Sequence, residues 1–236
     1  MKILAIDTTG KTASVAIVDQ EHVIAEYTLN DTLTHSQTIL PMIDEICKKA
    51  HQNIQEIDYI ACANGPGSFT GLRIGAATAK GIALALQKEI IPVPTLDALA
   101  YNVGEVNNII CPIMDARRGQ VYTALYQWEN GECTRLTEYM AEPLEEIIEL
   151  IGERKALFLG DGVRVHRERL QKHSGFSFAP AHAMFQRAAS VGLLAIDFAK
   201  QGKSISGDRL DLIYLRKSQA EREREERLQA QEASDD

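Results

Sequence analysis

A glycine-rich turn followed by hydroxyl side chains is the stretch of this 236-residue chain whose chemistry is easiest to name. The apolar run 59–63 predicts a buried strand. Gly65-Pro66-Gly67 must end that strand, because both glycines admit a positive φ and proline has no N–H to donate. Ser68 and Thr70 are candidate N-caps for a following helix. Backbone N–H groups at such a turn could hold phosphate, although the spacing matches neither the P-loop nor the dinucleotide-binding pattern.

Small residues form a stripe along the predicted helix 70–87. Gly71, Gly75, Ala79 and Ala83 lie four residues apart, so one side of this helix is almost bare backbone. Each interior glycine costs about 1 kcal/mol relative to alanine, which indicates that something approaches this side closely. The chain's own sheet and a helix of another protein fit the stripe equally well on these grounds.

Two aspartates stand at similar places in the two halves of the chain. Asp7 ends an apolar run and is followed by Thr8 and Thr9, and Asp115 ends the apolar run 108–114. An aspartate in such a turn can orient Mg²⁺ or water while hydroxyl and N–H groups receive phosphate oxygens. The simpler interpretation, which we favour, is that each aspartate caps its turn by accepting backbone N–H groups.

The two aspartate turns resemble those of the actin-like ATPases, in which a nucleotide is held between two lobes. The turn from Gly160 to Gly162 is placed like the adenosine turn of that superfamily. Arg117 and Arg118 are bulky where a phosphate turn lined by backbone needs glycine. The resemblance therefore implies a degraded nucleotide site made of Asp7, Thr8, Thr9, Asp115, Gly160 and Gly162.

Other catalytic arrangements find no support in the spacing of the residues. The six histidines form no HxxxH or HExxH pair, and Ser68 lacks the GxSxG frame of a nucleophilic serine. We therefore predict no metal site and no catalytic residue. The four cysteines are far apart, which favours reduced thiols and a cytoplasmic protein, and no segment has the length or composition of a signal peptide or membrane span.

The net charge of −8 argues against this chain binding nucleic acid by itself over a wide surface. Contact with RNA is therefore expected only through a more basic partner. The charge is concentrated partly at the end of the chain, where residues 216–236 are rich in Arg, Glu and Gln. This segment has charge pairs at helical spacing but no sustained apolar stripe, which predicts a frayed or disordered tail.

The order of predicted elements repeats once along the chain. Strands at 2–6, 13–18 and 22–29 are followed by helices at 34–50 and 70–87, and a second hairpin begins at 108 with one strand expected over 120–128. Further helices are expected near 143–151, 163–172 and 188–200. The repeat predicts an α/β protein of two similar lobes, each a mixed sheet with flanking helices, with domain boundaries at 1–103, 104–215 and 216–236.

Five blocks of sequence resemble the TsaB (YeaZ) family. They are ILAIDTT near the start, HSQTILP from His35, GPGSFTGLRIG from Gly65, IMDARRGQVY from Ile113 and YLRKSQAE from Tyr214. The resemblance covers the chain up to about Glu221, and the block from Gly65 is highly specific. It implies the actin-like fold and a non-catalytic paralogue of TsaD in the synthesis of threonylcarbamoyladenosine, the modified adenosine beside the tRNA anticodon.

The resemblance also implies partners and a surface that binds them. TsaB proteins bind TsaD through two helices of the N-terminal lobe, can form homodimers through the same helices, and work with the ATPase TsaE. No tightly bound cofactor is expected, ATP and Mg²⁺ being used by the partner complex, and tRNA is met only through that complex. The interface residues predicted on this basis are Ile39, Ile43, Ile46, Gly71, Leu72, Ile74, Gly75, Thr78, Ala79, Ile82, Ala83 and Leu86.

Two other functions compete with this one. An actin-like small-molecule kinase or ATPase would use Asp7 and Asp115, and tight binding of ATP with Mg²⁺ would favour it. A glycopeptidase is the least favoured, because the chain lacks the spacing of metal ligands that such an enzyme needs.

Overall fold

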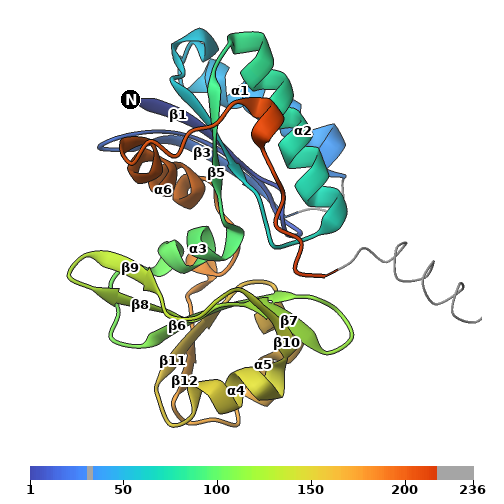
Figure 1. Cartoon of the computed structure of the whole chain (residues 1–236), viewed down its shortest axis with the longest axis vertical. Coiled ribbons are helices and arrows are strands. Elements are labelled where there is room, and N and C mark those ends of the chain that lie inside the picture. Colours follow the sequence, from blue (N-terminus) through green and yellow to red (C-terminus); the bar gives the residue numbers. More distant parts are fainter. Residues whose placement is uncertain (31–33, 217–236) are drawn as a thin grey trace, which may run out of the picture.

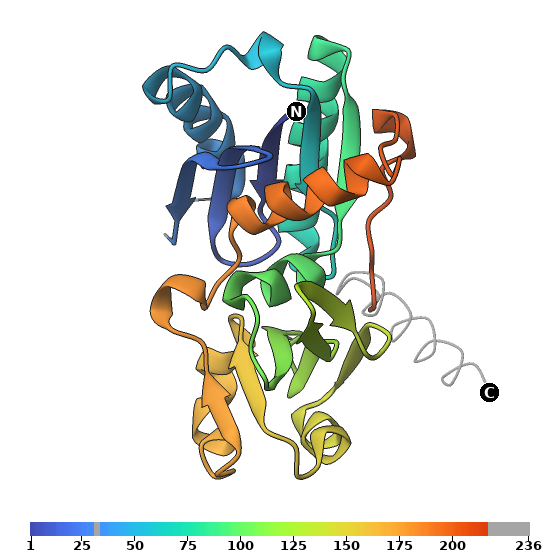
Figure 2. The same ribbon diagram turned by 90° about the vertical axis from the view of Figure 1, so that its left-hand side faces the viewer.

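The computed structural model describes residues 1–30 and 34–216. In it the chain forms two α/β lobes, each built around a mixed sheet (Figure 1). Figure 2 shows the two lobes stacked along the long axis of the molecule. No helix of the described residues is long and apolar enough to span a membrane. The predicted tail 216–236 lies outside the described residues except for Arg216.

The sheet of lobe 1 has the strand order β3-β2-β1-β4-β5. β1 and β2 pair antiparallel, as do β2 and β3, whereas β4 and β5 continue the sheet parallel to β1. The strands are β1 (Lys2–Asp7), β2 (Ala13–Asp19), β3 (Val23–Leu29), β4 (Tyr59–Ala63) and β5 (Glu89–Val93).

The sheet of lobe 2 repeats this order as β10-β7-β6-β11-β12. Its central strand β6 (Ile109–Asp115) pairs antiparallel with β7 (Gln120–Thr123) and parallel with β11 (Ala156–Leu159). β10 (Met140–Pro143) and β12 (Phe176–Phe178) are the two edges. The predicted fold class, two similar mixed-sheet lobes of the actin-like type, is confirmed by this repeat and by the solved structures reported below.

The strand predicted over 120–128 is wrong as a single element. It breaks at Ala124 and Leu125 into β7 and β8 (Tyr126–Glu129), and β8 pairs with β9 (Glu132–Arg135) and the start of β6. Both residues at the break are buried in the core of lobe 2. The chain changes partner strand here, which a run of β-forming residues cannot signal.

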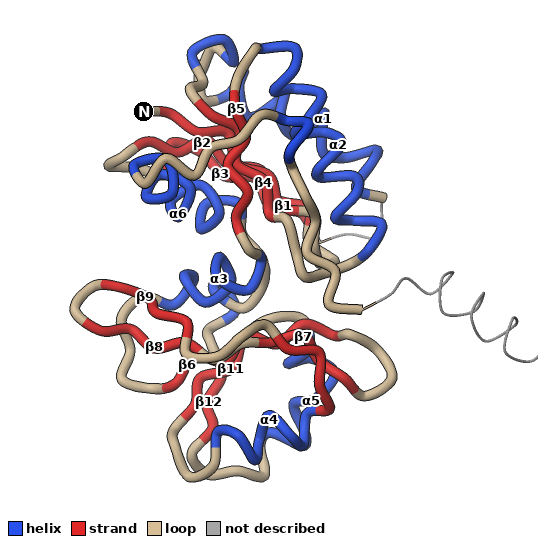
Figure 3. Tube along the Cα trace, in the orientation of Figure 1, coloured by secondary structure: helices blue, strands red, loops and turns tan. Residues whose placement is uncertain are grey.

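Helices cover both faces of the first sheet. α1 (His35–Lys49) and α2 (Phe69–Leu86) pack on one face, and α6 (Ala188–Lys200) packs on the other (Figure 3). Alternate residues of β1 serve the two faces, since Leu4 and Ile6 contact the α1 and α2 side while Ile3 and Ala5 contact the α6 side. The remaining helices are α3 (Thr95–Ala100), α4 (Leu144–Ile151) and α5 (Gly162–Leu170), with short 3-10 turns at Ile54–Glu56, Tyr101–Val103, Ala181–Ala183 and Gly207–Arg209.

The position of α6 corrects the predicted domain 104–215. Although it follows the second sheet in sequence, α6 buries Val191, Ala195 and Ile196 against the first sheet. Gly192 allows the close approach, because a Cβ there would lie 2.7 Å from a Val18 methyl group. Residues 201–216 also return to lobe 1, where Ile205 bridges to Ile90. Lobe 1 is therefore completed by the end of the described chain.

Candidate functional site between the lobes and on the helices of lobe 1

The Asp7 turn is buried, and hydrogen bonds within the turn hold one of the two Asp7 carboxylate oxygens. Asp7 is 1% exposed, and its Oδ1 accepts hydrogen bonds from the Thr9 backbone N–H at 2.9 Å and the Thr9 hydroxyl at 2.7 Å. Burial raises the pKa of Asp7, an effect that the two Thr9 bonds and nearby His35 partly offset. The other carboxylate oxygen is buried and has no partner among the described residues. The turn-capping interpretation describes this geometry.

The glycine-rich loop lies directly on the Asp7 turn. The Ser68 N–H, which a phosphate would need, donates to the Thr9 carbonyl at 2.7 Å, and the Thr8 hydroxyl donates to the Gly71 carbonyl at 2.7 Å. A Cβ at Gly71 would overlap the Thr8 carbonyl oxygen, and one at Gly75 would overlap the Thr8 hydroxyl. The predicted Ser68 cap is confirmed, since its hydroxyl accepts from the Gly71 N–H.

The predicted docking role of the small-residue stripe is therefore wrong. The stripe faces the chain's own first sheet, and its glycines allow α2 to approach the Asp7 turn. The predicted interface residues that are buried this way are Ile39, Ile43, Ile46, Gly71, Leu72, Gly75, Ala79 and Ala83. The other four, Ile74, Thr78, Ile82 and Leu86, are half-buried.

The outward side of the same two helices is open and mostly apolar. On α2 the exposed positions include Ala77, Gly81 and Ala85, together with Leu84, whose side chain is 82% exposed. A Cβ at Gly81 would meet no atom of the described residues within 4 Å. Leu40 on neighbouring α1 is 55% exposed. We call the α2 residues Ala77, Gly81, Leu84 and Ala85 the outer face of α2; sequence reasoning missed them because two small-residue stripes run along one helix.

The Asp115 turn in lobe 2 is built differently. Asp115 is exposed, and its Oδ1 accepts the Arg117 N–H at 2.8 Å. Behind it, Asp161 accepts the Asp115 N–H at 3.1 Å, and burial raises the pKa of Asp161. The flanking Gly160, with φ +100°, and Gly162 pack closely on the end of β6. The structure thus brings Asp115, Gly160 and Gly162 together, with Asp161 as an addition that sequence reasoning did not single out.

The space between the two turns is occupied by a side chain of the protein itself. Gln186 is 2% exposed, and its amide lies so close to Gly10 that a Cβ there would come within 2.6 Å. A cavity of about 40 Å³ remains, and its lining includes Lys11, Asp115 and Asp161. Ligand pockets for drug-sized molecules usually measure about 300–1,000 Å³. In this conformation the cavity holds a few atoms and not a nucleotide.

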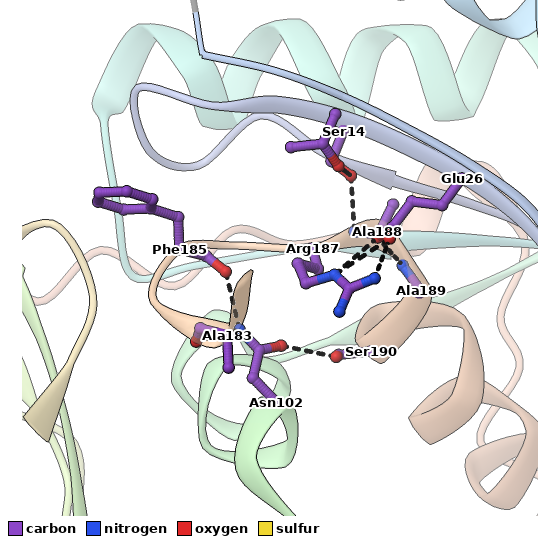
Figure 4. A network of polar contacts seen from close by, with 10 residues as sticks. Ser14, Glu26, Asn102, Ala183, Phe185, Arg187, Ala188, Ala189 and Ser190 are labelled. Atoms are coloured by element: carbon purple, nitrogen blue, oxygen red, sulfur yellow. Dashed lines mark hydrogen bonds and ion pairs between the residues drawn. The ribbon is translucent and has the colours of Figure 1, made fainter. Parts of the chain in front are cut away.

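Asn102 fixes the segment that carries Gln186 (Figure 4). Its side-chain amide donates to the carbonyls of Ala183 at 3.1 Å and Phe185 at 2.7 Å, and its oxygen accepts from the Ser190 hydroxyl at 2.6 Å. Asn102 belongs to the first connection between the lobes, and these partners belong to the second. The hydrogen bonds of Asn102 therefore join the two segments that connect the lobes to each other.

The start of α6 is held from the other side by the first sheet (Figure 4). Glu26 on β3 forms an ion pair with Arg187 and accepts the Ala189 N–H at 3.0 Å, and Ser14 on β2 accepts the Ala188 N–H at 2.9 Å. These bonds use N–H groups that a helix start leaves free. They keep Gln186, one residue before Arg187, on the Asp7 turn.

Known proteins resemble this chain over most of its length. The family model described as TsaD, tRNA N6-adenosine threonylcarbamoyltransferase, matches residues 22–221. The Bacillus subtilis (strain 168) tRNA threonylcarbamoyladenosine biosynthesis protein TsaB is 38% identical over 173 residues, which are 72% of this chain and 76% of the relative. The Escherichia coli (strain K12) protein of the same name is 32% identical over 93% of this chain and 96% of its own length.

Solved structures agree with the sequence relatives. YeaZ from Pseudomonas aeruginosa matches with a TM-score of 0.79 and 25% identity, covering 91% of this chain and 99% of the other. The activator of the 2-hydroxyisocaproyl-CoA dehydratase from Clostridium difficile, with bound ADPNP, matches with a TM-score of 0.53 and 12% identity over 86% of this chain and 97% of the other. The second likeness shows the fold alone.

Proposed function

This chain belongs to the TsaB (YeaZ) family, and from that membership we propose that it is a non-catalytic subunit of tRNA threonylcarbamoyladenosine synthesis that binds and supports the TsaD enzyme. TsaD would transfer the threonylcarbamoyl group to the adenosine next to the anticodon, with the ATPase TsaE joining the pair. tRNA would meet this chain within that complex in the cytoplasm. The names of its relatives support the pathway.

The observation that carries the proposal is the exposed apolar side of α2. Leu84 is 82% exposed and is flanked by small residues that allow another helix to approach closely. Burying a leucine side chain stabilises a complex by about 1.5–3 kcal/mol. We therefore move the proposed contact with TsaD from the buried stripe to the outer face of α2 and to Leu40 of α1, with half-buried Ile74 and Thr78 at its edge. A homodimer would use the same surface.

The geometry between the lobes supports the non-catalytic part of the proposal. Gln186 fills the space at the Asp7 turn, where one Asp7 carboxylate oxygen is bonded to Thr9 and the other is buried. No tightly bound cofactor is proposed, and ATP with Mg²⁺ is assigned to the partner complex. Titration calorimetry with ATP and Mg²⁺ tests this, because tight binding that Asp7→Asn abolishes would establish the kinase or ATPase alternative instead.

Leu84→Glu tests the proposed contact. A charge at the centre of an apolar interface should weaken co-purification with TsaD at least about tenfold and lower threonylcarbamoyladenosine formation in a mixture of this chain, TsaD and TsaE to the same degree. The chain alone should show no transfer.

Leu150→Glu on α4 is the matched control for Leu84→Glu. Leu150 is 44% exposed on lobe 2, away from the proposed contact. The same substitution there should leave co-purification and the mixed reaction unchanged. Equal effects of the two variants would remove the outer face of α2 from the proposal.

A further inference from the structure

Residues 211–216, the last that the structure describes, form a segment that joins the two lobes at one side, and we call this segment the strap. The Ile213 N–H donates to the Asn64 carbonyl at 2.8 Å, and the Asn64 side-chain amide donates to the Asp211 carbonyl at 3.1 Å. The strap ends at Arg216, whose guanidinium donates to the carbonyls of Ala116 and Arg117. Three segments far apart in sequence therefore meet here: the start of α2, the strap and the β6–β7 turn.

Four arginines gather where these segments meet. Arg73 comes from α2, Arg117 and Arg118 from the β6–β7 turn, and Arg216 from the strap; the first three are exposed. Within residues 1–30 and 34–216, no ion pair joins any of the four to a carboxylate. We call these four residues the arginine patch. The guanidinium groups of the three exposed arginines are available to an anion from outside.

An aromatic pair stands within the arginine patch. Tyr214 is 42% exposed and packs on Phe69 with the ring centroids 5.0 Å apart. The Arg73 guanidinium lies over the Phe69 ring at 3.9 Å, and its Nε donates to the Tyr214 hydroxyl at 3.4 Å. Stacking fixes the plane of the guanidinium without using all of its N–H groups, so the group remains able to bind a phosphate.

Acidic residues adjoin the patch on two sides. Asp115 precedes the arginine turn, where its Oδ1 accepts the Arg117 backbone N–H, and Asp211 lies on the strap. Together with the net charge of −8, these carboxylates weaken the attraction of the patch for a polyanion. Binding here should be local, weak and strongly dependent on salt.

We propose that the arginine patch binds the phosphodiester backbone of single-stranded RNA, with an unpaired base stacked on Tyr214. Guanidinium groups bind phosphate oxygens bidentately, and exposed aromatic rings stack on bases in most proteins that bind single strands. An acidic protein segment would use the arginines but not the exposed ring, which is why RNA fits better. The inference deepens the proposed function, on which it rests for the identity of the natural RNA as tRNA.

The test is fluorescence anisotropy of a labelled hairpin RNA with a single-stranded loop, titrated with the full chain at several salt concentrations. Arg117→Asn with Arg118→Asn removes two charges, and asparagine tolerates the backbone of this turn. Affinity for the RNA should fall on the order of tenfold. The plot of log affinity against log salt concentration should become shallower, its negative slope decreasing in magnitude by about 1.4. Arg117→Lys with Arg118→Lys keeps both charges, so it should keep the salt dependence while losing part of the affinity, because lysine cannot bind phosphate bidentately.

Lys155→Ala with Lys172→Ala is the matched control. Both lysines are exposed in lobe 2 outside the patch, and their removal changes the net charge by the same amount. RNA binding should be unchanged. An equal loss in both double variants, no loss in the asparagine variant, or no binding by the wild-type chain would each overturn the proposal. Polyglutamate that binds the patch more tightly than the RNA at equal charge would overturn it in favour of an acidic protein partner.

The outcome is separable from that of the proposed function. Leu84→Glu should bind the hairpin RNA normally while losing TsaD, and the asparagine variant should co-purify with TsaD while binding RNA poorly. Loss of RNA binding in Leu84→Glu would mean that the two surfaces are one, which contradicts the inference. Normal RNA binding in a chain that never binds TsaD would contradict the proposed function alone.

Discussion

The two lobes share a strand order but have opposite versions of the same turn. In lobe 1 the turn after β1 is covered by the start of α2 and by Gln186, and Thr8 and Thr9 are buried. In lobe 2 the turn after β6 is exposed and carries Arg117 and Arg118 with φ values of 62° and 54°. The two lobes therefore share the order of their strands but differ in the exposure and the side chains of this turn.

The covered turn and the exposed turn leave each lobe a different surface for contact with other molecules. Lobe 1 uses its turn for internal packing, which leaves the outer face of α2 as the surface we propose for a protein partner. Lobe 2 uses its turn as an exposed cationic loop, which the strap connects to lobe 1 through Arg216. The two lobes thus present different surfaces to the outside.

Gly71→Ala is the variant for which we expect the largest change in stability. The new methyl group would overlap the Thr8 carbonyl oxygen, so α2 or the Asp7 turn must shift. We expect a loss of about 2–3 kcal/mol in the free energy of unfolding, as in overpacked cores. Denaturation in urea measures it.

Gly81→Ala on the same helix is the control for Gly71→Ala. The added Cβ would meet no atom within 4 Å in the part of the chain that the structure describes, so the helix should gain stability of up to about 1 kcal/mol. Opposite signs at the two glycines would confirm that α2 closes the turn with one side and leaves the other open. Equal signs would contradict the packing described for lobe 1.

The second test is the pH dependence of Asp7→Asn. Burial raises the pKa of Asp7 above that of the unfolded chain, about 3.9, so the native state resists ionisation of this carboxyl. The charged form lowers stability above the folded pKa, and this penalty disappears as the pH falls through the folded pKa towards 4. Asparagine can still accept from Thr9, so the variant should be more stable at pH 7 by about 1 kcal/mol and equal to the wild type near pH 4.

Asp115→Asn separates the two turns in the same experiment. Asp115 is exposed in the open turn, so its replacement should have little effect on the melting temperature across this pH range. A variant of Asp7 that loses stability at pH 7 would show instead that its bonds to Thr9 outweigh the cost of burial.

The sequence predicts the frame of the fold because local pattern determines it. Apolar runs ending in Asp7 and Asp115 placed the two hairpins, and the helical period placed α1, α2 and α6 to within two residues. The direction in which α2 faces was not predictable in this way. Its buried stripe and its outer face are both made of small residues, and only the fit of Gly71 and Gly75 to the Thr8 backbone decides between them.

The space between the lobes was beyond sequence reasoning for a different reason. Gln186 contacts Thr12 across 174 residues of chain, and nothing near Gln186 in sequence marks it. Its position depends on Asn102 and Glu26 in two further segments. Contacts of this kind appear only when the path of the chain is known, which is also why α6 was assigned to the wrong lobe.

The smallest test concerns the open turn itself. A left-handed backbone costs an ordinary residue about 1–2 kcal/mol, and asparagine less. Arg118→Asn should therefore raise the free energy of unfolding by about 0.5 kcal/mol, whereas Arg164→Asn within α5 should lower it by a few tenths because asparagine is a poorer helix former than arginine. Thermal unfolding of both variants measures the difference. A stabilised turn that nonetheless loses RNA would separate binding from folding, whereas a destabilised one would mean that the arginines hold the turn in place.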